Sequence, residues 1–226
     1  MWRGAVSATR GEAAQVILLH GMAQNAWSMA WLAHDLRSAG YRVHNIGYPT
    51  RPYDVAELSA RYLAPAVAAC EPTAPVHLVT HSLGGIIARH YLQHAHLPPG
   101  SRIVMLAPPN HGSEVADAVR SWPLYRWWMG RVGQQLGTGP DSIVHTLGPI
   151  AAAVGIIAGN RSIQPWFSWL IPGEDDGAVS VASTRLDEMR DFIVVAASHT
   201  MIMFNREARA QVRHFLRHGE FLHPEC

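Results

Sequence analysis

Short, continuous apolar runs alternate with helical segments along most of the chain, and this alternation is the strongest constraint on its fold. The runs are too short for helices, and the first of them, residues 16–19, is apolar at every position, as a strand covered on both faces is. Strands that are separated by helices pair in parallel. We therefore expect an α/β fold, with a mainly parallel sheet of about six strands and helices on both faces. The expected strands are residues 16–19, 41–46, 76–79, 102–106, 154–158 and 192–196.

Start and stop signals delimit the helices between these strands. The segment 24–39 has a helical apolar stripe and is stopped by Gly40, and Asp54 with Glu57 forms a capping-box pattern before the next helix. Further helices are expected at 82–93 and 205–219. The alternation falters at 113–150, which indicates an insertion or small cap. No repeat or linker divides the 226 residues, so a single domain is the simplest expectation.

Composition excludes several classes of protein. Hydrophobic residues make up 48% and charged residues 15%, which excludes a disordered chain. The net charge of +1, without blocks of like charge, excludes an electrostatic nucleic-acid surface. The apolar stretch 150–158 is too short to span a bilayer. Residues 1–15 lack the apolar core of a signal peptide, so we expect a cytoplasmic protein, or a secreted one if a leader has been removed.

The strongest chemical signal is Thr80-His81-Ser82-Leu83-Gly84-Gly85, which lies between an apolar strand and an apolar helix. A serine on a sharp strand-to-helix turn projects into a cleft, and the turn needs small neighbours because two backbones approach closely there. Gly84 and Gly85 meet this need. Thr80 stands where the G-x-S-x-G pattern has its first glycine, which leaves the tightness of the turn in question. The segment predicts Ser82 as a nucleophile.

A serine hydroxyl needs a base, and the base needs an orienting group. His199 follows the last expected strand and is the predicted base, with His20, His81 and His111 as competitors. We expect His20 and His81 to shape loops by hydrogen bonding.

An acid is expected between the nucleophile and the base in the chain. Asp175 and Asp176 both fit, and Asp176 is favoured because Gly177 follows it and supplies a tight turn. The alternative is that both aspartates only start a turn.

A tetrahedral intermediate also needs hydrogen-bond donors for its oxyanion. The backbone N–H of Leu83 is one candidate, because it lies at the start of the helix after Ser82. The loop His20-Gly21-Met22 follows the first strand, and the N–H of Met22 is the second candidate. The two cysteines, Cys70 and Cys226, do not lie in a setting expected of a catalytic thiol, and a disulfide between them is not expected.

These segments together resemble small bacterial lipases and esterases of the α/β-hydrolase superfamily. The resemblance rests on residues 19–22, 80–85, 107–113, 176–177 and 198–199, and it extends over roughly 15–220. It implies a minimal α/β-hydrolase fold that lacks the first strands of the full superfamily sheet. It also implies hydrolysis of a small-molecule or lipid ester without a cofactor, and no clear set of metal ligands is visible.

Substrate and reaction type remain open at this level. Trp127, Trp128 and Trp166 are candidates for lining an acyl pocket. Core packing, or an exposed patch for a lipid or a partner, explains the same residues. A thioesterase, amidase or acyltransferase would use the same fold, and a non-catalytic binding protein is the remaining alternative.

Overall fold

The computed structural model describes residues 13–223. Residues 1–12, which carry most of the signal-peptide expectation, and Cys226 lie outside this range. The six predicted strands are present and lie in one sheet, in the order β2-β1-β3-β4-β5-β6 with every neighbouring pair parallel. The strands are β1 (Gln15–Leu19), β2 (Arg42–Ile46), β3 (Val76–His81), β4 (Arg102–Leu106), β5 (Ala153–Gly159) and β6 (Asp191–Val195).

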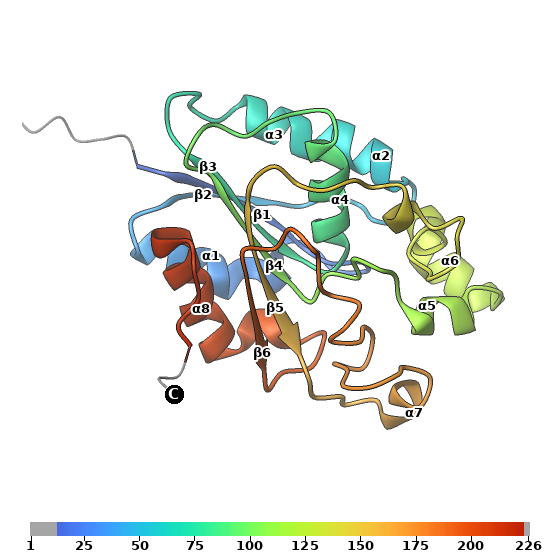
Figure 1. Cartoon of the computed structure of the whole chain (residues 1–226). Coiled ribbons are helices and arrows are strands. Elements are labelled where there is room, and N and C mark those ends of the chain that lie inside the picture. Colours follow the sequence, from blue (N-terminus) through green and yellow to red (C-terminus); the bar gives the residue numbers. More distant parts are fainter. Residues whose placement is uncertain (1–12, 224–226) are drawn as a thin grey trace, which may run out of the picture.

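Helices cover both faces of this sheet, as expected (Figure 1). One face carries the segment α2 (Val55–Leu58), η2 (Ser59–Leu63) and α3 (Ala64–Ala68), together with α4 (Leu83–Leu92). The other face carries η1 (Ala26–Met29), α1 (Ala30–Ser38), η4 (Ile202–Phe204) and α8 (Arg206–His218).

Side-chain alternation along the strands builds two separate cores. In β1, Ile17 and Leu19 pack on the α4 side, whereas Val16 and Leu18 pack on the α8 side. All four side chains are completely buried. A strand that is covered on both faces favours apolar side chains at successive positions, which is why residues 16–19 form an unbroken apolar run.

Local signals explain where the helices begin and end. Asn25 caps η1, so the helix expected from residue 24 starts two residues later. The Asp54–Glu57 capping box forms as predicted. The π-helical turn at Ser59–Leu63 has no clear sequence signal and was not predicted.

The predicted insertion lies between β4 and β5. It contains α5 (Glu114–Val119), α6 (Pro123–Gly133) and η3 (Ile143–His145). The connection from β5 to β6 contains the short helix α7 (Pro165–Ser168). Because all strands are parallel, both segments leave the sheet at its carboxyl edge (Figure 1). Within the described residues, no helix combines the length and the hydropathy that crossing a bilayer requires.

Candidate active site

Ser82 lies on a sharp turn between β3 and α4, at the carboxyl edge of the sheet. Its backbone has φ 50° and ψ −120°, a conformation that non-glycine residues rarely adopt. The N–H of Ser82 donates to the carbonyl of Leu106 (2.9 Å), and its own carbonyl accepts the N–H of Gly85 (2.9 Å). These bonds fix the turn and place the hydroxyl of Ser82 at the N-terminal end of α4.

The turn forms although Thr80 replaces the first glycine of the usual pattern. Thr80 is fully buried in β3, where it is paired with Leu19 and Met105. A Cβ on Gly85 would lie 3.0 Å from the Cβ of Pro108 and 3.4 Å from the Thr80 hydroxyl oxygen. The tighter of these contacts is with Pro108, so Thr80 is accommodated within the strand itself.

His199 lies between Ser82 and Asp176 and contacts both. Its Nε2 is 2.9 Å from the Oγ of Ser82, and its Nδ1 is 2.8 Å from Oδ2 of Asp176. The three side chains come from loops after β3, β5 and β6, and they are separated by up to 117 residues in the chain. The structure therefore joins the predicted nucleophile, base and acid in one hydrogen-bonded series.

The two neighbouring aspartates have different partners. Asp176 is almost completely buried, and its Oδ1 accepts the N–H groups of Ala178 (3.0 Å) and Val179 (2.9 Å). Asp175 turns away from His199 and accepts the hydroxyl of Ser168 (2.8 Å) and the N–H of Gly177 (2.7 Å). Asp176, the favoured candidate, is the aspartate that contacts His199.

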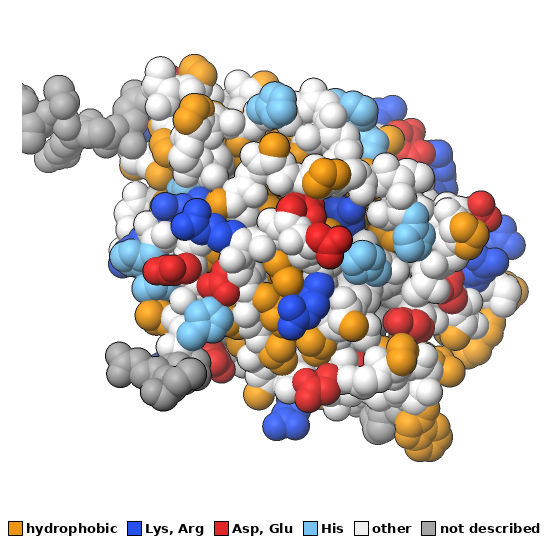
Figure 2. All heavy atoms as spheres, viewed as in Figure 1, with side chains coloured by type: hydrophobic (Ala, Val, Ile, Leu, Met, Phe, Trp, Pro, Cys, Tyr) orange, Lys and Arg blue, Asp and Glu red, His pale blue; other side chains and the backbone are white. Residues whose placement is uncertain are grey.

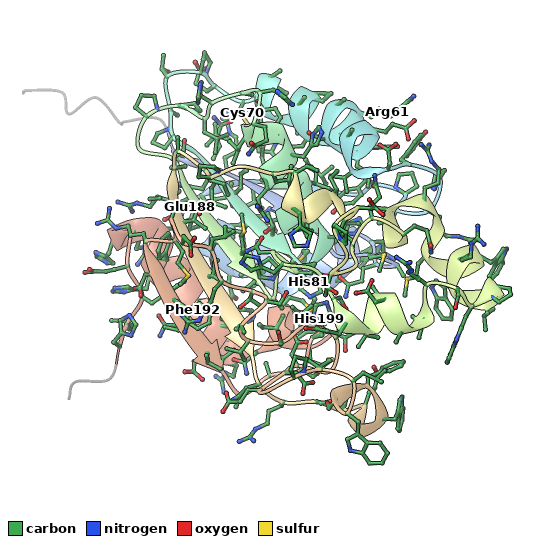
Figure 3. The ribbon with its side chains drawn as sticks, turned by 45° about the vertical axis from the view of Figure 1, so that its right-hand side comes forward. Arg61, Cys70, His81, Glu188, Phe192 and His199 are labelled. Carbon is green, nitrogen blue, oxygen red and sulfur yellow. The ribbon has the colours of Figure 1, made fainter. Side chains whose placement is uncertain are left out.

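His81 supports the backbone of His199. Figure 3 shows the two side chains close together in the middle of the molecule, with ring centroids 5.0 Å apart. The carbonyl oxygen of His199 lies 2.8 Å from Nε2 of His81 and can only accept, so Nε2 carries the proton. Burial holds the pKa of His81 well below its usual value, which keeps the ring neutral.

The same ring lies between the backbone of His199 and the loop after β1. Its Nδ1 is 3.0 Å from Oε1 of Gln24, the oxygen that accepts the N–H of Gly21 (3.1 Å). Sequence reasoning expected His81 to shape a loop but missed Gln24. The only available signal was the position of Gln24 just after the first strand.

The loop after β1 is held in place by His20 as well. The ring of His20 stacks on Tyr48, with centroids 4.0 Å apart, and its Nε2 accepts the N–H of Tyr48 (3.3 Å). The Tyr48 hydroxyl donates to the carbonyl of His20. The expectation that His20 shapes a loop by hydrogen bonding is confirmed. His111 is exposed, and its backbone N–H donates to the carbonyl of Ser183 (3.0 Å).

The two predicted oxyanion donors have unpaired N–H groups. Within the part of the chain that is described, the N–H groups of Met22 and Leu83 have no acceptor. Leu83 is the first residue of α4, so its N–H lies at the positive end of that helix. A partly negative oxygen is the chemical partner that suits such donors.

A cavity of about 930 Å³ opens beside the loop after β1. Two of the predicted substrate residues, Trp127 and Trp128, line it together with Ala23, Gln24 and Tyr48. Trp166 lies on α7, away from these lining residues. Among residues 13–223, His, Cys, Asp and Glu side chains form no group of three that could hold a metal ion.

Solved structures with the same fold include several hydrolases. A Bacillus licheniformis lipase, BlEst2 in its mature form, has a TM-score of 0.72 at 22% identity, and the match covers 95% of each chain. The metagenomic carboxyl esterase MGS0156 has a TM-score of 0.65 at 17% identity, covering 84% of this chain and 65% of that one. A type II thioesterase, YbtT, of the yersiniabactin pathway has a TM-score of 0.60 at 15% identity and covers 96% and 95%. These likenesses show the fold alone.

Sequence comparison gives the family. No curated protein matches the chain. A family model described as "Alpha/beta hydrolase family" matches residues 16–220, which include every residue of the hydrogen-bonded series. By this match, with the parallel sheet and the strand-to-helix turn that carries Ser82, the chain belongs to the alpha/beta hydrolase family.

Proposed function

We propose that this protein hydrolyses carboxylic esters through an acyl-enzyme formed on Ser82. The observation that carries the proposal is the hydrogen-bonded series from Ser82 through His199 to Asp176, with distances of 2.9 Å and 2.8 Å. This is the geometry that lets a neutral imidazole remove the proton of a serine hydroxyl. The lipase and the carboxyl esterase among the structures of similar fold make an ester the first substrate to test.

In the first half of the reaction, Oγ of Ser82 attacks the ester carbonyl while Nε2 of His199 takes its proton. Buried Asp176 holds the ring and stabilises the positive charge that forms on it. The N–H groups of Met22 and Leu83 donate to the developing oxyanion. His199 then returns the proton to the alkoxide oxygen, and the alcohol leaves.

In the second half, water attacks the acyl-enzyme. His199 takes a proton from the water, the same donors stabilise the second tetrahedral intermediate, and the carboxylic acid leaves as Oγ of Ser82 recovers its proton. Each step uses side chains and backbone N–H groups of this chain, and water.

Replacing the nucleophile tests the proposal. We expect Ser82→Ala to lower kcat for p-nitrophenyl butyrate by roughly 10³-fold or more, because the attacking oxygen is lost. The release of p-nitrophenolate measures the rate. Ser38→Ala, at an exposed serine at the end of α1, is the matched control and should keep full activity. Equal turnover by wild type and Ser82→Ala would contradict the proposal.

A thioesterase is the second candidate, because YbtT has the same fold. Comparing kcat/KM for an oxygen ester and a thioester of the same acyl group distinguishes the two. We expect the oxygen ester to react with the higher value, and a strong preference for the thioester would replace the first assignment with the second.

A further inference from the structure

The tryptophans of this protein are on its surface. All seven tryptophans among residues 13–223 are exposed, from 56% for Trp128 to 88% for Trp169. Tryptophan is usually well buried in soluble proteins, because its large apolar ring gains most from leaving water. A surface that keeps so many of these rings in contact with water is typical of an interaction site.

Five of the seven lie on two projections, which we call the tryptophan tips. One tip is residues 120–128, at the end of α5 and the start of α6, and the other is residues 163–170, around α7. Hydrophobic side chains gather at the lower right margin of the space-filling view, where Figure 1 places α6 and α7 (Figure 2). The exposed large apolar residues of the tips are Trp122, Leu124, Trp127, Trp128, Ile163, Trp166, Trp169 and Leu170.

Both tips flank the candidate active site. The hydroxyl of Ser113, the residue that caps α5, donates to the carbonyl of Ala178 (2.7 Å). The hydroxyl of Ser168, in α7, donates to Asp175 (2.8 Å). The second tip, and α5 that leads to the first, are therefore tied to the loop that carries Asp176, at the edge of the sheet at which Ser82 lies.

The first tip stands clear of the core. Gly130 interrupts α6 with φ 63° and ψ −155°, a conformation suited to glycine, and a Cβ there would meet the backbone of Arg51. After this break Val132 is fully buried, whereas Trp127 and Trp128 before it are 65% and 56% exposed. The break at Gly130 thus separates the first part of α6, where the two tryptophans are exposed to solvent, from the last turn, where Val132 packs in the core.

The charged residues of the first tip are both arginines, Arg120 and Arg126. The second tip contains no charged residue; Arg161 precedes it, and Glu174 and Asp175 follow it. Arg131 is paired with Asp54 and Glu57 of the neighbouring helix. Arg120, Arg126 and Arg161 are exposed. A second copy of the chain would bring these like charges face to face, whereas an anionic surface would neutralise them.

We propose that the tryptophan tips dock on an anionic lipid surface, which sets the mouth of the active site against the lipid. Tryptophan side chains concentrate at the boundary between hydrocarbon and water, where the ring meets the apolar phase and the indole N–H stays hydrated. Arginines beside them add attraction to negatively charged head groups. Docking itself needs no catalysis, and only the conclusion that lipid esters are the substrates rests on the proposed ester hydrolysis.

Vesicle binding by the Ser82→Ala protein tests the docking without hydrolysis of the lipid. Co-sedimentation is measured with vesicles of phosphatidylcholine, alone and with about a quarter of phosphatidylglycerol. We expect binding to the mixed vesicles, and a loss of about tenfold or more in affinity when Trp122→Ser and Trp169→Ser are combined, one from each tip. Trp31→Ser is the matched control, because Trp31 is 60% exposed but lies beside Arg209 of α8. It should leave the affinity unchanged.

A separate variant tests the contribution of the arginines to vesicle binding. Arg120→Gln combined with Arg126→Gln should reduce binding to the mixed vesicles and leave binding to pure phosphatidylcholine as it was. No binding to either vesicle, or equal loss with Trp31→Ser, would overturn the proposal. So would a wild-type dimer that the Trp122→Ser and Trp169→Ser changes convert to a monomer, since the tips would then bind a second copy.

The proposed ester hydrolysis is assessed separately. Turnover of water-soluble p-nitrophenyl butyrate by the wild-type protein depends on the site but not on a lipid surface. Turnover without vesicle binding would refute docking alone, and vesicle binding without turnover would refute the ester hydrolase alone.

Discussion

The backbone of Ser82 is held in a conformation that costs about 1–3 kcal/mol for a residue with a side chain. The φ of 50° turns the chain so that the hydroxyl meets His199 while the next N–H starts α4. A residue with ordinary strand or helix geometry could not direct its side chain to His199 and also place the next N–H at the start of α4. The strain therefore belongs to the site, and the surrounding sheet and helix maintain it.

Asp175 and Asp176 allow a comparison within one loop. We expect Asp176→Asn to lower kcat for p-nitrophenyl butyrate by roughly 10³-fold or more, because the imidazole loses the partner that fixes its tautomer. Asp175→Asn keeps an oxygen that can accept from Ser168 and Gly177, so its loss should stay within about tenfold. Steady-state rates of both variants make the test, and a larger loss at Asp175 would reverse the assignment of the acid.

At the scale of elements, the site depends on how closely α4 approaches β1. A Cβ on Gly84 would lie 2.7 Å from the carbonyl oxygen of Leu19 and 2.8 Å from the Leu19 Cβ. Contacts of this length do not occur, so any side chain at this position moves the helix away from the sheet. The helix carries Ser82 and Leu83 at its start, and the loop with Met22 begins just after Leu19. The distance between the two predicted oxyanion donors therefore depends on this contact.

Gly84→Ala is expected to lower the free energy of unfolding by about 1–3 kcal/mol, through overpacking against the Leu19 backbone. Urea unfolding followed by circular dichroism measures it. The control is Gly139→Ala, because a Cβ on Gly139 would have no atom within 4 Å. The control should change stability by no more than about 0.5 kcal/mol. Equal unfolding midpoints for the two variants would show that α4 and β1 are not in close contact.

At the scale of the whole molecule, the sheet could be predicted from sequence because its inner strands are covered on both faces. Such strands are mostly apolar, and the helices between the strands fix their parallel direction. The convergence of Ser82, Asp176 and His199 follows from the same topology, since loops that leave the carboxyl ends of parallel strands meet at one edge. The order of the three residues in the chain, serine first, then aspartate, then histidine, was the sequence signal from which this convergence was predicted.

The positions of the tips could not be predicted, because periodicity shows which side chains are apolar but not what covers them. Trp127, Trp128 and Trp166 were equally consistent with a core, an acyl pocket and an exposed patch. The structure shows all three exposed, and Trp127 and Trp128 also line a cavity. The contact between His81 and Gln24 was missed for a related reason, since the two residues are 57 positions apart and their meeting depends on the whole fold.

Covalent trapping of the nucleophile tests the central claim most directly. Diethyl p-nitrophenyl phosphate should transfer one diethylphosphoryl group to Oγ of Ser82, with release of p-nitrophenolate, and mass spectrometry of the peptides locates the adduct. We predict a single adduct on Ser82 in the wild-type protein, and labelling slower by roughly 10³-fold in His199→Ala, which lacks the base. An adduct on a different residue, or equal labelling rates with and without His199, would contradict the account.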